Sequence, residues 1–368
     1  MATKVESILN QSKEKQVTIR VDRVHHMCLT ISTEHPDHVY PDLLAFYTSF
    51  VGLRSYRIPT EQLDREKSIQ GLEDLGAGKQ EVKVDAESGE EVHMGTYYYL
   101  CGEDASKDAA LIDFVTFHLE PGQNVEALQS MNGAGLRNVT FLVDNLDELY
   151  ARGQSEGVEF LSAPAEFEWG GLGRVKYAVM RDPLKNPVEF IQLGEASAGQ
   201  CKVLRVFSLN HNTQDIEKAL DFYRDGCGMN VEHVVEHSGR EFGIAMGFDG
   251  AVTATSYLLK GANKGEETAY FTITDWEDPK TAPQKIPEGY TPAWYRMWFW
   301  IEGSDNVRQL YDDLGPRMKQ VSGEPFTFAS PEPWGPVTIG FFFDHDDAMM
   351  EFACHDGHWD GMHEVLEG

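Results

Sequence analysis

Several features are scarce in this 368-residue chain. Its five cysteines are scattered and form no Cys-x-x-Cys pair, which excludes a small disulfide-stapled fold and predicts reduced thiols. No apolar run approaches the ~20 residues of a membrane-spanning helix. The polar start, Met1 to Arg20, also lacks the apolar stretch of a secretory signal. We therefore expect a cytoplasmic protein without a membrane partner.

Basic residues are also few, with 31 Lys and Arg against 60 Asp and Glu, and the formal net charge is −29. A surface this acidic repels phosphate backbones, so nucleic acid is excluded as the expected partner. A small-molecule substrate is the expected partner, and a homodimer is possible. The length is sufficient for two domains that each bury a core.

The chain repeats its own motifs. Phe46-Tyr47 followed by Gly52-Leu53 returns as Phe222-Tyr223 followed by Gly228-Met229. Asn145-Leu146 followed by Leu149-Tyr150 likewise returns as Asn306-Val307 followed by Leu310-Tyr311. Two matched pairs at identical spacing predict a tandem duplication of a two-module unit.

Each repeat has the pattern of a βαβββ module, in which an alternating strand is followed by an amphipathic helix and further strands. In the first strand, His26, Cys28 and Thr30 alternate with Met27 and its apolar neighbours, so His26 is predicted to face away from the helix. His25 falls on the opposite, core-facing side and is predicted to be structural.

The predicted organisation has two domains joined by the small, polar linker Glu195 to Gln200. An N-terminal extension (1–20) precedes the first domain (21–195), and a tail (357–368) follows the second (201–356). The predicted modules are 21–120, 135–195, 201–276 and 292–356.

These motifs carry a family resemblance. The strand His26 to Ile31, the Phe46-Tyr47 helix, and the turn and strand from Asp182 to Phe190 resemble the vicinal oxygen chelate superfamily. That group includes glyoxalases, extradiol dioxygenases, epimerases and bleomycin-resistance proteins. The resemblance covers about residues 22–355 and implies an α+β fold: two (βαβββ)2 cup-shaped barrels with mixed sheets and helices outside. It does not fix the reaction.

The resemblance also implies a metal site, because family ligands lie on the first and last strands of paired modules. In the N-terminal half these positions are His26, Asp113, Asn138 and Glu189. They would hold one divalent ion (Fe, Mn, Zn, Ni or Co), with Glu189 and Asp113 as catalytic carboxylates. A carboxylate within the apolar strand around Glu189 is costly to bury unless it is paired or coordinated.

The corresponding C-terminal positions are Ser208, Thr272, Arg296 and Glu351. A guanidinium cannot lose its proton and repels a cation, so this half is predicted to lack a metal. Arg296 is expected either to form a salt bridge with Glu351 or to bind an anionic part of a ligand.

Substrate contacts are predicted from segments that should line or rim the N-terminal cup. The candidates are Tyr98, Trp169, Arg174, Tyr177 and Asn138.

Three functions remain open from the sequence. The first is a metal-dependent, non-oxidative enzyme that stabilises an enolate or oxyanion on a substrate with adjacent oxygens. The second is an Fe(II) extradiol dioxygenase of a catechol-like ring, which would need His25 or His118 as its second histidine. The third is a small-molecule binding protein without catalysis.

Overall fold

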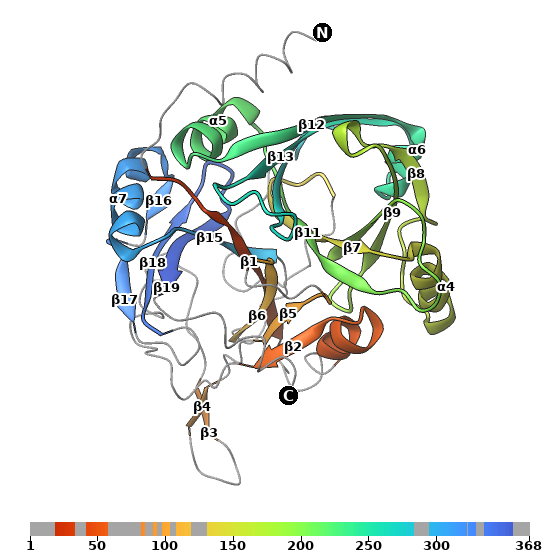
Figure 1. The fold of residues 1–368 in the computed structure, drawn as a ribbon, viewed down its shortest axis with the longest axis horizontal. Coiled ribbons are helices and arrows are strands. Elements are labelled where there is room, and N and C mark those ends of the chain that lie inside the picture. Colours follow the sequence, from red (N-terminus) through yellow and green to blue (C-terminus); the bar gives the residue numbers. More distant parts are fainter. Residues whose placement is uncertain are drawn as a thin grey trace.

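The computed structural model describes residues 19–33, 42–57, 82–84, 91–93, 98–103, 108–118, 131–282, 294–321, 323–328 and 335–355. Two large curled mixed sheets lie side by side, with helices on their outer sides (Figure 1). The predicted α+β fold built from repeated βαβββ modules is confirmed.

Each module contributes a first strand, a helix and a return of further strands. Module one comprises β1 (Arg23–Thr33), η1 (Phe46–Phe50), β2 (Arg54–Arg57), β5 (Tyr98–Cys101) and β6 (Leu111–His118). Module two comprises β7 (Gly135–Val143), α4 (Leu146–Glu156), β8 (Ala165–Glu168), η3 (Gly170–Leu172), β9 (Arg174–Arg181) and β10 (Pro187–Leu193). A short hairpin of β3 (Val82–Val84) and β4 (Glu91–His93) stands apart from both large sheets.

The second half of the chain repeats this order. Module three comprises β11 (Val203–Asn212), α5 (Ile216–Leu220), η4 (Asp221–Gly226), β12 (Asn230–Gly239), α6 (Arg240–Ala245), β13 (Val252–Lys260) and β14 (Tyr270–Asp278). Module four comprises β15 (Trp294–Trp300), α7 (Ser304–Leu314), η5 (Gly315–Arg317), β16 (Gln320–Val321), β17 (Phe326–Phe328), β18 (Val337–Phe343) and β19 (Met349–His355).

The repeated sequence motif has a local structural cause. Gly52 and Gly228, which end the two Phe-Tyr helices, have φ of 88° and 70°. A residue with a side chain is strained in this left-handed region, whereas glycine is not, so a glycine follows the C-cap of each helix.

The pairing of modules differs from the prediction. One sheet runs β16-β18-β19-β15-β1-β6-β5-β2 and therefore joins modules one and four. The other runs β12-β13-β14-β11-β7-β10-β9-β8 and joins modules two and three. The prediction that each half of the sequence closes its own cup is wrong. Every module offers the edge of its first strand, and sequence order does not determine which two edges meet.

We call the inner face of modules one and four cup 1, and that of modules two and three cup 2. At the centre of each sheet two first strands pair antiparallel, β1 with β15 and β7 with β11. The first and last strands within a module pair parallel, as β1 does with β6 and β7 with β10.

A continuous apolar core joins the two sheets and contains residues of all four modules. Two buried tyrosine–aspartate hydrogen bonds also cross between the sheets: the Tyr47 hydroxyl donates to Asp182 at 3.2 Å, and the Tyr223 hydroxyl donates to Asp344 at 2.6 Å. The two cups are thus parts of one packed unit rather than separate domains.

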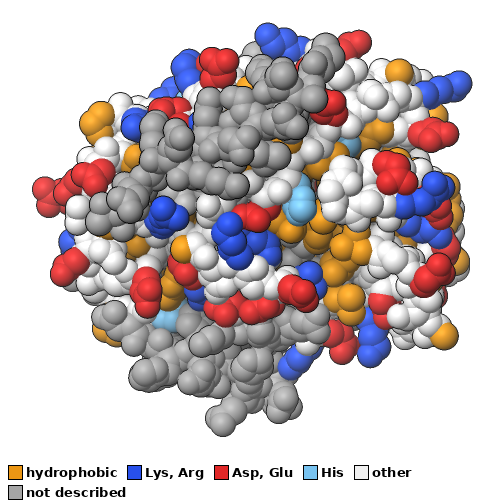
Figure 2. Space-filling view, turned by 45° about the horizontal axis from the view of Figure 1, so that its top comes forward, with side chains coloured by type: hydrophobic (Ala, Val, Ile, Leu, Met, Phe, Trp, Pro, Cys, Tyr) orange, Lys and Arg blue, Asp and Glu red, His pale blue; other side chains and the backbone are white. Residues whose placement is uncertain are grey.

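Charged side chains of both signs are scattered over the face drawn in Figure 2, and hydrophobic side chains gather right of its centre. The predicted linker, residues 195–200, is exposed. Among the helices of the described ranges, none has the length and apolar character needed to cross a membrane.

Candidate functional site

The strand registers confirm which residues are equivalent in the four modules. Each module has one predicted site position on its first strand and one on its last strand. The last-strand residue pairs with the residue two positions after the first-strand one. The pairs are Cys28 with Asp113, Thr140 with Glu189, Asn210 with Thr272, and Trp298 with Glu351. The first-strand positions are therefore His26, Asn138, Ser208 and Arg296, as predicted.

The module pairing nevertheless divides the predicted metal set. His26 and Asp113 belong to cup 1, together with Arg296 and Glu351. Asn138 and Glu189 belong to cup 2, together with Ser208 and Thr272. The prediction that His26, Asp113, Asn138 and Glu189 share one ion is not supported, because its two halves lie in different sheets.

Cup 1 contains a buried network of ionisable groups. Arg296 forms an ion pair with Glu351, which confirms the predicted contact. Arg296 Nε also donates to Cys28 Sγ at 3.4 Å, and Cys28 Sγ donates to Asp113 Oδ2 at 3.3 Å. His26 Nε2 lies 4.0 Å from the same Asp113 oxygen.

Burial dominates the protonation of this network. It raises the pKa of Asp113 and of Glu351 to about 7, against the opposing attraction of Arg296. Burial, reinforced by Arg296, lowers the pKa of His26 well below its ordinary value. Cup 1 thus holds one permanent positive charge, two carboxyl groups that titrate near neutrality, and a neutral histidine.

The prediction that His25 faces away from His26 is wrong. A register shift between Val24 and His26 interrupts the alternation of β1. The Nδ1 atoms of the two histidines therefore lie 2.7 Å apart. The His25 ring packs among the rings of Trp298, Trp300 and His355.

The family's four-position metal set does not fit either cup. In cup 1 the fourth position is Arg296. Its charge repels a cation, and its guanidinium forms an ion pair with Glu351, which would otherwise be a ligand. In cup 2 the only ionisable member of the four is Glu189. A smaller group, His26, Cys28 and Asp113, does bring three ligand atoms within 4.8 Å of one another.

Cup 2 is organised around Glu189. Its carboxylate accepts from Asn138 Nδ2 at 2.7 Å, from Thr140 Oγ1 at 2.6 Å and from Asn210 Nδ2 at 2.9 Å. A further hydrogen bond comes from Tyr177. Burial raises the pKa of Glu189, while these four donors act in the opposite direction because they stabilise the ionised form.

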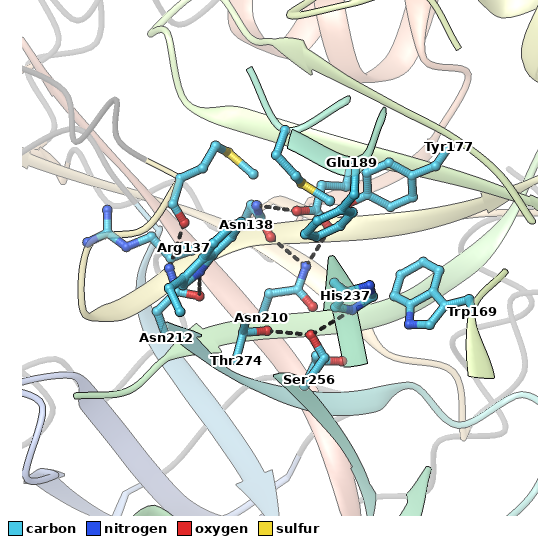
Figure 3. A pocket seen from close by; sticks show the side chains of 15 residues that line it. Arg137, Asn138, Trp169, Tyr177, Glu189, Asn210, Asn212, His237, Ser256 and Thr274 are labelled. Atoms are coloured by element: carbon cyan, nitrogen blue, oxygen red, sulfur yellow. Dashed lines mark hydrogen bonds between the residues drawn. The ribbon is translucent and has the colours of Figure 1, made fainter. Parts of the chain in front are cut away.

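A cavity of about 40 Å³ lies beside this carboxylate (Figure 3). Its walls come from both modules of cup 2, with Trp169 and Tyr177 from module two and His237, Phe242 and Trp276 from module three. Phe242 stacks on His237 at a centroid distance of 4.3 Å and belongs to the short helix α6. An aromatic wall around a few hydrogen-bonding groups is typical of a small-molecule site.

Two buried polar atoms on this wall have no hydrogen-bond partner among the described residues: Trp169 Nε1 and Thr272 Oγ1. Leaving such groups unpaired is costly, and a bound molecule or water is the usual partner. Beside Trp169, His237 Nε2 lies 3.1 Å from Ser256 Oγ, which lies 2.9 Å from Thr274 Oγ1. Burial lowers the pKa of His237 to about 3, so this histidine is neutral.

The predicted substrate residues are only partly brought together. Asn138, Trp169 and Tyr177 line the cup 2 cavity with Glu189. Arg174 is exposed and forms an ion pair with Glu166 at 3.0 Å, so it does not line the cavity. Tyr98 begins β5 in the other sheet.

The sequence reasoning missed the contributions of module three, including His237, Phe242, Ser256, Thr274 and Trp276. These residues were overlooked because modules one and two were assumed to share a cup. A signal that could have found part of this set was the alternation in 272–276, which places Thr272, Thr274 and Trp276 on one face of β14.

Comparisons with known proteins support the superfamily resemblance. Residues 205–352 match the Glyoxalase/Bleomycin resistance protein/Dioxygenase superfamily. A point mutant of glyoxalase I from Zea mays is similar in structure, with a TM-score of 0.57, 14% identity, and coverage of 98% of this chain and 99% of that chain. A putative dioxygenase from Bacillus subtilis has a TM-score of 0.54 at 11% identity, covering 95% of this chain and 90% of that one. No curated protein sequence matches.

The predicted resemblance to the vicinal oxygen chelate superfamily is therefore confirmed. At these identities the structural neighbours establish the fold, and the reaction has to be argued from the two cups themselves.

Proposed function

We propose that cup 2 binds a small organic molecule with adjacent oxygens and transfers a proton at a carbon next to a carbonyl, with Glu189 as the base. The observation that carries this proposal is the cavity beside Glu189, whose wall holds two buried polar atoms without a partner among the described residues, Trp169 Nε1 and Thr272 Oγ1. Such donors suit an oxygen on which negative charge develops.

The proposed step is an enolisation. The C–H proton moves to the Glu189 carboxylate, and the electron pair of that bond shifts to the carbonyl oxygen as an enolate. Hydrogen bonds from Trp169 and Thr272 stabilise the enolate oxygen. If the proton on Glu189 first exchanges with solvent, its return to the same carbon gives deuterium exchange. In an α-hydroxyketone, its return to the neighbouring carbon, with the hydroxyl proton moving to the enolate oxygen, gives an isomer.

The surroundings of Glu189 suit this task. Asn138, Thr140, Tyr177 and Asn210 fix the carboxylate in position and favour its ionised form. Burial opposes these donors and raises the pKa of Glu189 above its ordinary value. No metal ligand set is required, since the stabilising donors are neutral groups of the cup.

The cavity sets the size of the substrate. A volume of about 40 Å³ admits a molecule of only a few heavy atoms while Phe242 keeps its present place. Short α-hydroxyketones and 1,2-dicarbonyls meet this limit and carry adjacent oxygens.

Deuterium exchange tests the proposal without knowledge of the natural product. We expect the protein to catalyse incorporation of deuterium from D2O into hydroxyacetone or acetoin, as measured by NMR. Glu189→Gln should abolish this exchange. The control is Glu166→Gln, because Glu166 is a half-exposed carboxylate on β8 outside the cavity.

The same preparation separates catalysis from binding. Trp169 and Trp276 line the cavity, so intrinsic fluorescence should report ligand entry. Binding without exchange would favour a non-catalytic binding protein, whereas neither binding nor exchange by any α-hydroxyketone or dicarbonyl would contradict the proposal.

A second candidate is a metal-dependent reaction in cup 1, favoured by the proximity of His26, Cys28 and Asp113. It predicts one metal ion per purified chain that is lost in His26→Ala. Among the described residues, neither potential metal group contains two histidines, so the two-histidine set of an extradiol dioxygenase has no support in cup 1.

A further inference from the structure

A second cluster of metal-binding side chains lies outside both cups, where module three meets module four. His211 belongs to β11, and Asp344 and Asp346 belong to the turn between β18 and β19. These three residues are buried, and one ligand atom from each lies within 4.8 Å of the others. Because β11 and this turn belong to different sheets, the cluster bridges them.

The distances suit a shared ion. His211 Nε2 lies 3.1 Å from Asp346 Oδ2 and 3.5 Å from Asp344 Oδ2. Two ligands bound ~2.0–2.2 Å from one ion are roughly 3.0–3.5 Å apart, depending on whether the geometry is octahedral or tetrahedral. One imidazole and two carboxylates form a donor set for a transition metal such as Zn²⁺ or Mn²⁺.

Both carboxylates are held in place by groups behind them. Asp344 Oδ1 accepts from the backbone N–H groups of Asp346 and Ala348 at 2.9 Å each, and its Oδ2 accepts from Tyr223. Asp346 Oδ1 accepts from the Gln214 N–H at 3.1 Å. Such supporting hydrogen bonds orient the side chains that bind a metal.

The duplicated chain offers an internal comparison. The Asp182 turn of module two has the same hydrogen-bonded form as the Asp344 turn, and both have a residue with positive φ three positions on, Lys185 at 69° and Asp347 at 65°. Each aspartate also accepts from a helix tyrosine. The tyrosine–aspartate pair is therefore part of the common fold and by itself does not indicate a metal.

The additional polar residues occur at only one of these two junctions. Counting from Asp182 and Asp344, His345 and Asp346 replace Pro183 and Leu184. Counting from His26 and Ser208, His211 replaces Leu29. Three positions that are apolar at the junction of modules one and two are two histidines and an aspartate at the junction of modules three and four. Apolar side chains at the first junction show that packing does not require polar residues there.

An entry route is present. His345 Nε2 lies 3.0 Å from Asp346 Oδ2 and also lines an open surface pocket of about 500 Å³. Asp215 and Asp221 line the same pocket and form ion pairs with Lys218 and Arg317, while Glu217 adds one further acidic group to the lining.

From this geometry we infer that His211, Asp344 and Asp346 bind a divalent transition-metal ion that links the two sheets, with His345 at the entrance. The ion compensates the two buried carboxylates and joins module three to module four. Its position outside both cups makes it independent of the reaction proposed for cup 2.

The test is metal titration of the full chain, with Zn²⁺ by calorimetry and Co²⁺ by absorption, after treatment with a chelator. A His26→Ala/Cys28→Ala background removes the competing group of cup 1. In that background we expect one Co²⁺ per chain, without a thiolate charge-transfer band, and a rise in Tm on adding metal. Asp346→Asn and His211→Gln should each weaken binding at least tenfold and abolish the rise in Tm.

The control is Asp215→Asn/Glu217→Gln, which removes acidity at the mouth and should leave the stoichiometry unchanged. Absence of binding in the background protein would overturn the inference, as would binding that Asp346→Asn and His211→Gln leave intact. If Asp346→Asn lowers Tm equally with metal and with chelator, the cluster is a hydrogen-bonded contact only, and the inference fails.

Discussion

The two cups are built from equivalent strand positions but hold different chemistry. Cup 1 combines His26, Asp113, Arg296 and Glu351, so its centre is filled by an ion-pair network. In cup 2 the same positions are Asn138, Glu189, Ser208 and Thr272, which leaves a single carboxylate surrounded by neutral donors and a cavity. One fold has thus produced a buried ion-pair network in cup 1 and a carboxylate beside a cavity in cup 2.

The two cups differ most in charge at the position of Arg296 and Ser208. Arg296 takes one of the four equivalent first-strand positions and forms an ion pair with Glu351. In cup 2 the equivalent Ser208 is small and donates to Asn210 Oδ1. The charged side chain is thus tied up in an ion pair, whereas the short neutral one makes a hydrogen bond to an amide.

The largest expected effect comes from removing the charge in cup 1. Arg296→Met leaves Glu351 buried without its partner and should lower the free energy of unfolding by about 3–5 kcal/mol, measured by urea denaturation. Arg296→Met/Glu351→Met should recover much of that loss. Arg174→Met removes the exposed pair with Glu166 and should cost less than about 1 kcal/mol. A single Arg296→Met variant as stable as the wild type would show that the network is not structural.

The comparison can also be reversed by giving cup 1 the ligand it lacks. Arg296→His would place a second imidazole beside His26, Asp113 and Glu351 and remove the repelling charge. We expect one additional Zn²⁺ per chain, bound at least tenfold more tightly than any ion in wild-type cup 1. Ser208→His in cup 2 should produce no such site, because its neighbours are mainly amides and hydroxyls. Equal gains in both variants would contradict the distinction between the cups.

Stability should depend on pH through cup 1. Asp113 and Glu351 have folded-state pKa values of about 7, above their unfolded values of about 4. The folded state therefore holds more protons between pH 4 and 7, and stability falls as the pH rises through this range. Asp113→Asn should flatten that fall in a series of Tm measurements from pH 5 to 8. A slope identical to that of the wild type would exclude Asp113 as its source.

The smallest expected effect concerns the size limit of cup 2. Phe242→Ala removes the ring that stacks on His237 and should enlarge the cavity. Binding of a single-ring phenol, followed by tryptophan fluorescence, should become roughly five times tighter by the transfer of apolar surface. Phe341→Ala is the matched control, because this ring lies against Arg296 in cup 1. If Phe341→Ala changes phenol affinity as much as Phe242→Ala does, the conclusion that the ligand binds in cup 2 would be contradicted.

Much of the fold could be predicted because it depends on local patterns. The Phe-Tyr helices and their terminal Gly52 and Gly228 identify the modules, and strand alternation identifies the inward positions, including the contact of Arg296 with Glu351. The pairing of modules could not be predicted, because every first strand presents a similar edge and the choice depends on tertiary packing. The predicted set of His26 with Glu189 therefore failed, although each residue had been placed on the correct strand face.

The site in cup 2 depended on the same missing information. Glu189, Trp169 and Tyr177 were identified from their strands, but their partners Asn210, His237 and Phe242 come from a module assigned to another cup. The bulge that turns His25 toward His26 was also invisible, since alternation predicts opposite faces for neighbouring residues.

The most direct test of the account is to measure deuterium exchange into hydroxyacetone by two matched variants, Glu189→Gln in cup 2 and Glu351→Gln in cup 1. The two glutamates hold equivalent positions on β10 and β19. The account predicts that exchange is lost in Glu189→Gln and retained in Glu351→Gln. Retention in Glu189→Gln with loss in Glu351→Gln would place the reaction in cup 1 and contradict it.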